Sequence, residues 1–166
     1  MTHLEIAIQK FRDYVVSQSK ANLTRGDKSD SKELYNSIDG KISINTSNAS
    51  VDFLMAEYGM YQDKGVSGTI RKYNTPYSYK SKMPPIKGIS EWAKRRNIRL
   101  REDNGRFAVG DYKTIGFIIA RSIKKKGIKP SLFFTKPFEK AYSNLDELLL
   151  EALDKDLDKI LEDEQN

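Results

Sequence analysis

The C-terminal end of the chain carries an apolar pattern that is longer than a small core can cover. Apolar side chains recur there at helical spacing, at Phe138, Ala141, Tyr142, Leu145, Leu148, Leu149, Ala152, Leu153, Leu157, Ile160 and Leu161. The spacing predicts one amphipathic helix of roughly 25 residues, or about 37 Å at 1.5 Å per residue. Hydrophobic residues make up only 38% of the 166 residues, below the ~45–50% typical of globular chains. We therefore expect part of this helix to pack on another subunit, although its wide stripe favours core packing over a coiled-coil seam.

The composition argues against several classes of protein. The chain has no Cys and one His, His3, so disulfide frameworks, thiolate zinc sites, Cys nucleophiles and His-based triads are not expected. No apolar run approaches the ~18 residues of a membrane span, and the N-terminus lacks the pattern of a signal peptide. The length is that of one domain, or of a small core with arms. We expect a soluble protein made inside the cell, without a cofactor or a metal, and not an enzyme of a familiar kind.

The first part of the chain shows helical and then alternating periodicity. An amphipathic helix is predicted over residues 3–20 by the stripe Leu4, Ile8, Phe11 and Val15. Residues 22–31 are predicted as a loop, and residues 31–38 as one or two helical turns or an extended lead-in to a strand. A β-hairpin with a turn at 45–48 is then predicted by the alternating residues Ile42, Ile44, Val51, Phe53 and Met55.

The middle of the chain begins with a segment that has no periodicity. Gly, Pro and Tyr are frequent between residues 65 and 85, and a loop of about twenty residues in a compact domain is usually functional or ordered by a partner. We therefore expect the loop at 65–83 to be mobile in the free subunit and ordered in an assembly. A short helix should follow from Pro85 to about Asn97, with a buried face formed by Ile86, Ile89, Trp92 and Ala93.

Two further elements complete the middle of the chain. Residues 98–110 are predicted as a second hairpin or a β-arm, with a turn at 103–105. A helix is predicted to begin after the N-cap Asp111 and to end at Gly127, with an inner face of Ile115, Ile118, Ile119, Ser122 and Ile123. We expect Trp92, Ile89, Ile118 and Phe53 to be buried around a small mixed sheet. Trp92 could instead stack on a base, but its helical spacing favours a core position.

These elements predict an α+β fold. It should contain a small mixed or antiparallel β-sheet with β-hairpins, packed against a long N-terminal helix, two central helices and a long C-terminal helix. The expected organisation is one domain over residues 1–155, with the loop at 65–83 and the β-arm at 98–110, followed by an acidic C-terminal tail at 156–166.

The net charge of +6 is distributed unevenly along the chain. Residues 64–129 contain 18 basic and 4 acidic residues, whereas residues 139–166 contain 3 basic and 10 acidic residues. Such asymmetry indicates a basic face directed at a polyanion or an acidic partner. The alternative for any single cluster is that its charged residues simply solvate a helix face. The lysines at 124–126 can be explained locally, because cations are favoured at the C-terminal end of a helix. The candidates for contact with DNA or an acidic partner are Arg71, Lys72, Lys80, Lys82, Arg95, Arg96, Arg99, Arg101 and Arg106.

Carboxylates offer a weaker, catalytic interpretation. Asp52, Glu57 and Asp63, with Lys64, have a superficial similarity to the acid–acid–lysine set of a metal-dependent nuclease. Nothing in their spacing fixes the required geometry, and Asp63 to Gly65 are better explained as a turn that ends a strand.

Four motifs follow one another in a specific order. Leu34 to Ile38 follows the first helix, and a Tyr-Gly-x-Tyr-x-Asp-Lys-Gly stretch occupies residues 58–65. Pro84-Pro85-Ile86 leads to Trp92, and residues 118–141 combine a helix, Gly-x-x-Pro, an aromatic residue and a second helix with a small residue. The positions that carry these motifs are Leu34, Ser37, Ile38, Tyr58, Gly59, Asp63, Gly65, Pro85, Trp92, Gly127, Pro130, Phe134 and Ala141.

In this order, over residues 1–155, the chain resembles the small neck or tail-completion proteins of tailed bacteriophages, the family that includes the minor tail protein Z of lambdoid phages. The resemblance implies an α+β subunit without enzymatic activity, assembled as a sixfold or twelvefold ring in the virion. Its implied partners are the portal or adaptor, other neck or tail-tube proteins, and packaged DNA in the channel. The basic 66–83 loop and 98–110 arm depart from the family pattern. The alternatives are a free nucleic-acid-binding protein that uses residues 64–129, and a small nuclease.

Overall fold

The computed structural model describes residues 1–26, 32–45, 48–101, 105–107 and 110–164. The chain folds into two compact units. Unit 1 comprises Met1–Gly59 and Ser131–Asn166, and unit 2 comprises Met60–Pro130, so unit 2 is an insertion in the sequence of unit 1. The predicted α+β class is confirmed, because the described residues form helices and a two-stranded antiparallel sheet.

Unit 1 is built on the long helix α1 (His3–Arg25). A capping box starts this helix, in which the Thr2 side chain accepts from the Glu5 N–H and the Glu5 carboxylate accepts from the Thr2 N–H. The predicted helix is confirmed but ends about one turn later than expected. Its buried stripe continues through Ser19 and Leu23, and the polar Ser19 hides this continuation in the sequence.

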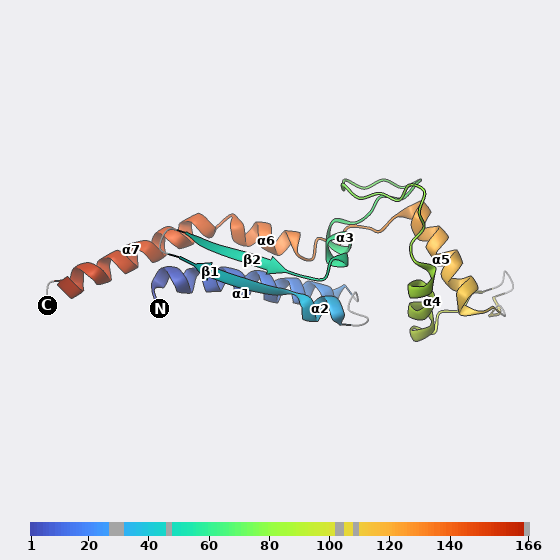
Figure 1. Cartoon of the computed structure of the whole chain (residues 1–166), viewed down its shortest axis with the longest axis horizontal. Helices are drawn as coiled ribbons and strands as arrows, with labels where there is room; N and C mark the ends of the chain where they lie inside the picture. The colour runs from blue at the N-terminus through green and yellow to red at the C-terminus, as the bar shows by residue number, and fades with distance from the viewer. Residues whose placement is uncertain (27–31, 46–47, 102–104, 108–109, 165–166) are drawn as a thin grey trace. The chain divides into compact units, whose positions relative to one another are not determined.

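The predicted hairpin is confirmed and packs on α1 (Figure 1). Strands β1 (Asp39–Ile44) and β2 (Ala49–Leu54) pair antiparallel with Ile42 opposite Val51, and the tip at 46–47 lies outside the described residues. The short helix α2 (Glu33–Ser37) precedes the hairpin. Of the two alternatives predicted for residues 31–38, the helical turns are therefore correct and the extended lead-in is not. A two-stranded sheet needs a packing partner, and α1 provides it where the Arg12 guanidinium donates to the Gly40 carbonyl at 3.1 Å.

The prediction of one continuous C-terminal helix is wrong. The structure has α6 (Thr135–Tyr142) and α7 (Leu145–Glu164), with a break at Ser143 and Asn144. At the break the Ser143 hydroxyl donates to the Lys140 carbonyl at 2.9 Å, and such side-chain bonds compete with the helical ladder. Residues 156–164, expected as an acidic tail, continue α7.

The core of unit 1 joins segments from both ends of the chain. Leu23, Leu34, Ile38 and Phe133 form a buried cluster, each at most 3% exposed. Beside it, the rings of Phe11, Phe53, Phe134 and Phe138 meet at centroid distances of 5.5–6.1 Å, a favourable range for aromatic pairs.

Unit 2 contains the paired helices α4 (Ile86–Arg95) and α5 (Tyr112–Lys126). The predicted ends of α5 are confirmed, because the Asp111 carboxylate accepts from the Thr114 N–H at 2.7 Å and Gly127 follows with φ 74°. The helices approach closely where Gly116 faces Ser90, and a Cβ at Gly116 would overlap the Ser90 side chain.

The predicted inner faces of these helices need correction. Ile118 is 43% exposed and lies on the outer face of α5, whose buried residues are Ile115, Gly116 and Ala120. Trp92 and Ile89 are half-buried on α4 and belong to unit 2, whereas Phe53 belongs to unit 1. The four residues therefore do not surround one sheet.

The segment before α4 contains a helix and a loop whose parts are connected by backbone hydrogen bonds. Helix α3 (Tyr58–Lys64) stands where a strand end was expected, so that prediction is wrong. In the following loop, the Ser67 N–H donates to the Tyr77 carbonyl and the Tyr79 N–H donates to the Ser67 carbonyl, both at 2.8 Å. The predicted change in the loop's mobility on assembly stays a prediction. Of the predicted arm, Arg101 and Phe107 form one antiparallel bridge, while 102–104 and 108–109 lie outside the described residues.

Candidate functional site

The nine predicted contact residues, all in unit 2, fall into two groups. The first, called here the loop–helix cluster, combines residues of the 65–83 loop with the last turn of α5. The loop approaches the helix end because the Thr69 N–H donates to the Lys124 carbonyl at 2.9 Å. The Lys124 ammonium also donates to the Ser81 carbonyl at 2.8 Å. The cluster comprises Arg71, Lys72, Lys80, Lys82, Lys124, Lys125 and Lys126.

Two side chains of the loop–helix cluster have defined contacts. The Lys72 ammonium donates to the Gly68 carbonyl at 2.9 Å, and the Arg71 guanidinium lies 5.4 Å from the centre of the Tyr73 ring. Burial raises the pKa of the nearby Tyr79 hydroxyl. These contacts hold the loop's cations beside the lysines that end α5.

The second group, called here the arm cluster, is organised by Phe107. The guanidinium groups of Arg99 and Arg101 lie 5.7 and 5.1 Å from the centre of its ring, within the ~6 Å of a cation–π contact. Phe107 itself is 55% exposed. The exposed residues Arg95, Arg96 and Arg106 complete the group by sequence position.

The two clusters belong to opposite ends of α5. The Tyr112 hydroxyl at its start lies 3.4 Å from the Asn97 side-chain oxygen, next to the arm cluster in sequence, while Lys124 to Lys126 end the helix. Fifteen helical residues span about 22 Å. The nine predicted contact residues therefore do not form one site. No sequence pattern predicts their separation into the loop–helix cluster and the arm cluster.

Several motif positions converge in unit 2 where its first and last segments meet. Val66 and Ile128 exchange two backbone hydrogen bonds of 2.8 Å. A Cβ on Gly65 would lie 2.6 Å from the Ile128 carbonyl oxygen and from Pro130, and one on Gly127 would overlap the Val66 carbonyl oxygen. Asp63, at the start of this crossing, is fully buried. We call the crossing of residues 63–68 with 127–130 the glycine crossing.

Other motif positions converge in unit 1. Leu34 and Ile38 lie in the buried cluster, with Phe134 packed against it. The Ser37 hydroxyl accepts from the Ala56 N–H at 2.9 Å, and a Cβ on Gly59 would come within 2.8 Å of Leu34. The remaining positions are the exposed Tyr58, Pro85 at the N-cap of α4, and the half-buried Trp92 and Ala141.

The carboxylates considered for a nuclease do not form a site. Asp52 and Glu57 are exposed, whereas Asp63 is 0% exposed to solvent. Over the described residues, no group of three or more His, Cys, Asp or Glu side chains is arranged to hold a metal ion.

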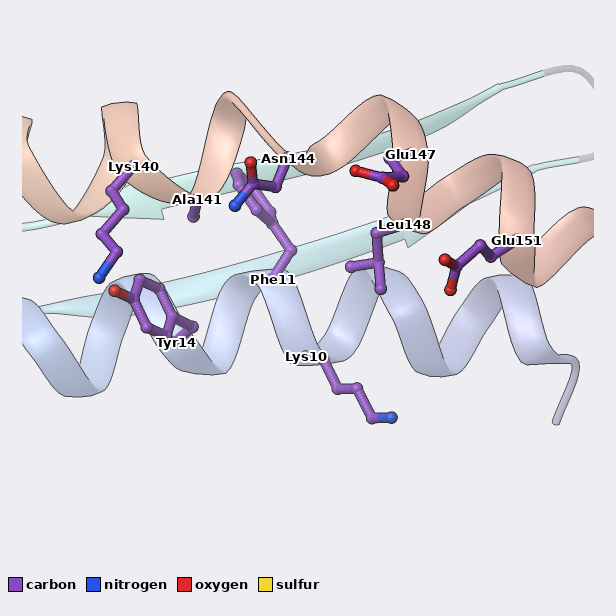
Figure 2. A pocket seen from close by; sticks show the side chains of 9 residues that line it. All are labelled: Lys10, Phe11, Tyr14, Lys140, Ala141, Asn144, Glu147, Leu148 and Glu151. Atoms are coloured by element: carbon purple, nitrogen blue, oxygen red, sulfur yellow. The ribbon is translucent and has the colours of Figure 1, made fainter.

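A groove in unit 1 runs between α1 and the pair α6–α7. Its volume is about 520 Å³, and Phe11, Ala141 and Leu148 contribute its apolar lining. Figure 2 shows Lys140 beside Tyr14 toward one end, with Glu147 and Glu151 toward the other. Because its ends carry both signs of charge, the groove favours neither a polyanion nor a cation.

Sequence reasoning missed the contact between the two ends of unit 1. The Asp156 carboxylate on α7 accepts from the N–H groups of His3 and Leu4 at 2.7 and 2.9 Å. Desolvation acts to raise the pKa of Asp156, but the hydrogen bonds from His3 and Leu4 outweigh it and lower this pKa. The pKa of Asp111 is lowered by its hydrogen bonds with Thr114. Asp156 is one of nine acidic residues in α7, so the sequence does not distinguish it as the residue that binds the start of α1.

Among the helices that the structure describes, none is long and apolar enough to cross a membrane. No protein-family model, curated protein or solved structure matches the chain.

Proposed function

We propose that this chain is a structural protein of a tailed-bacteriophage virion, located in the neck or upper tail and assembled as a ring of six or twelve copies. The ring joins the portal or adaptor to the tail and completes the head–tail junction. Its role is mechanical, with partners in the neighbouring rings and with its basic clusters directed at packaged DNA or at an acidic neighbour.

The observation that carries the proposal is the convergence of the motif positions. Gly65, Gly127 and Pro130 belong to two motifs more than sixty residues apart, yet they meet at the glycine crossing. Leu34, Ile38 and Phe134 likewise meet in the core of unit 1. Many of the residues that resemble the neck-protein family therefore lie where each unit is held together, as expected if the resemblance reflects the framework of the fold.

Purification of the full chain, followed by mass measurement in solution and electron microscopy, tests the proposal. We expect closed rings whose mass corresponds to six or twelve subunits. A chain that stays monomeric at every concentration, with no closed ring in the images, would contradict it.

The loop–helix cluster favours a second candidate function, the binding of free nucleic acid. Lysine and arginine groups that neutralise phosphates release counterions, so affinity for a duplex should fall with a log–log salt slope of about −0.9 per phosphate contact. Tight duplex binding by a monomeric chain, lost when Arg71, Lys72 and Lys124 are replaced by Ala, would favour this candidate over a ring protein.

A further inference from the structure

Helix α7 carries a second apolar stripe that unit 1 does not bury. Its buried residue, Ala152, faces α1 together with the half-buried Leu145, Leu148 and Leu149. The second stripe lies roughly a third of a turn away at 3.6 residues per turn. Its members are Leu150, Leu153, Leu157, Ile160 and Leu161, which are 63%, 44%, 49%, 55% and 57% exposed.

Helix α1 does not extend alongside the last part of this stripe. Asp156 binds the first backbone N–H groups of α1, on His3 and Leu4, so the start of α1 lies beside Asp156. Figure 1 shows α7 continuing past this end of α1. The residues from Leu157 to Leu161 therefore extend beyond the helix that packs the earlier part of α7.

The charge of α7 restricts what can cover the stripe. The helix contains nine acidic residues and only Lys155 and Lys159 as basic ones. Asp154 and Asp158 follow directly alongside the stripe on the helix surface. Pairing of two α7 stripes would bring these carboxylates together, and like charges at close range are destabilising. The complementary surface is thus apolar with a basic margin.

The outer face of α5 has these properties. Lys113, Phe117 and Arg121 follow one another at four-residue spacing, so they share one face of the helix. Phe117 and the neighbouring Ile118 are 45% and 43% exposed, and Lys125 extends the same row. Helix α5 contains five basic residues and no acidic one.

We propose that the stripe of α7 in one copy of the chain packs on the outer face of α5 in a second copy, with Asp154 and Asp158 against Lys113 and Arg121. The contact joins two different surfaces, and such head-to-tail contacts generate a closed ring or an open filament. The inference rests on the proposed ring function and identifies its subunit contact.

Charge exchange in the full chain tests the contact. One variant carries Asp154→Lys with Asp158→Lys, and the other carries Lys113→Glu with Arg121→Glu. All four side chains are exposed, so circular dichroism should be unchanged. We expect each variant alone to lose assembly, with the concentration for half-assembly raised about tenfold or more. An equimolar mixture should assemble again, because each exchanged surface then meets its complement.

A matched control places the same change of charge elsewhere on unit 1. Asp52→Lys with Glu57→Lys alters two exposed carboxylates outside α7 and should assemble like the unchanged chain. Replacement of both Leu157 and Ile160 by Ser should weaken assembly without restoration by either charge variant.

The outcomes separate this inference from the proposed function. If both charge variants form rings like the unchanged chain, the α7–α5 contact is wrong and the ring function stands. If the unchanged chain forms open filaments that the variants abolish and the mixture restores, the contact stands and the ring is wrong. If the unchanged chain is a monomer at every concentration, both the contact between copies and the ring function are wrong. This holds also if α7 packs against α5 of the same chain. Duplex binding that is lost only with Lys113→Glu and Arg121→Glu, with unchanged mass, assigns α5 to DNA and overturns the contact.

Discussion

Asp156 and His3 connect the two ends of unit 1. The Asp156 carboxylate accepts from the His3 backbone N–H at 2.7 Å and lies 2.9 Å from the His3 imidazole Nδ1. The negative charge stands at the N-terminal end of α1, where the helix dipole favours it. It also satisfies backbone N–H groups that no helix can satisfy internally. One side chain of α7 therefore acts as a cap for α1.

Asp156→Asn should lower the melting temperature of the protein. The folded state lowers the pKa of Asp156, so its charged form contributes stability above the unfolded pKa of about 3.9. That contribution is lost as the pH falls through the folded pKa. The difference in melting temperature between the unchanged protein and the Asp156→Asn variant should be present at neutral pH and vanish in acid. Asp163→Asn, which neutralises an exposed carboxylate of the same helix, is the control, and equal effects of both substitutions would contradict the capping role.

Ser19→Ala should stabilise unit 1. The Ser19 side chain is fully buried in α1, and among the described residues its hydroxyl has no hydrogen-bond partner. Removal of an unsatisfied buried hydroxyl, with the higher helix propensity of Ala, should raise the free energy of unfolding by about 1 kcal/mol. Ser17→Ala on the exposed side of the same helix is the comparison. It removes a hydroxyl that donates to the Tyr14 carbonyl at 3.1 Å, so it measures the gain in helix propensity together with the loss of that exposed hydrogen bond. A destabilised Ser19→Ala protein would show that the hydroxyl is satisfied.

Gly127→Ala should destabilise unit 2. Gly127 has φ 74°, and its Cβ would overlap the Val66 carbonyl oxygen. The backbone at φ 74° and ψ −171° lies in a region that is essentially restricted to glycine and alone costs about 1–3 kcal/mol for a residue with a Cβ, and the overlap adds to this cost. Gly105→Ala separates the two effects, since Gly105 has φ 80° in open space. Denaturant unfolding should show a larger loss for Gly127→Ala, and equal losses would leave the glycine crossing without a packing role.

Local signals explain which elements were predictable. Both ends of α5 were predicted, because Asp111 directly precedes the helix and Gly127 directly follows it, and each residue type strongly prefers that position. The break between α6 and α7 was not predicted, because the helical spacing of apolar residues continues through it. The hydrogen bond of the Ser143 hydroxyl does not change this spacing.

The candidate site shows the same division between local and distant information. The basic residues were predictable from sequence, and their separation into two clusters was not. The loop–helix cluster depends on the bond from Lys124 to the Ser81 carbonyl, which joins residues that no periodicity relates. The outer position of Ile118 depends on Gly116 meeting Ser90, because this close approach determines which side of α5 faces α4.

Phe133→Ala and Trp92→Ala should have unequal effects on stability. Phe133 is 1% exposed in the core of unit 1, so its truncation should cost about 3–5 kcal/mol. Trp92 is only half-buried on α4, so its truncation should cost less. Denaturant unfolding, followed separately for each unit by hydrogen exchange, measures both. A larger loss for Trp92→Ala would restore Trp92 as the main core residue of the chain.

Arg99→Glu with Arg101→Glu should leave the subunit folded and block its incorporation into virus particles, or cause leakage of packaged DNA. Both guanidinium groups rest on the exposed Phe107 ring. Exposed cation–π contacts contribute only about 0.5–1 kcal/mol each, so the melting curve should shift little. Arginine is suited to bidentate contacts with phosphate or carboxylate, and reversal of its charge turns such a contact into repulsion.

Lys87→Glu with Lys94→Glu, which changes the charge of exposed residues on α4 by the same amount, serves as the control. Particles that assemble and retain DNA with the Arg99 and Arg101 variants would show that the arm cluster is only a solvated surface.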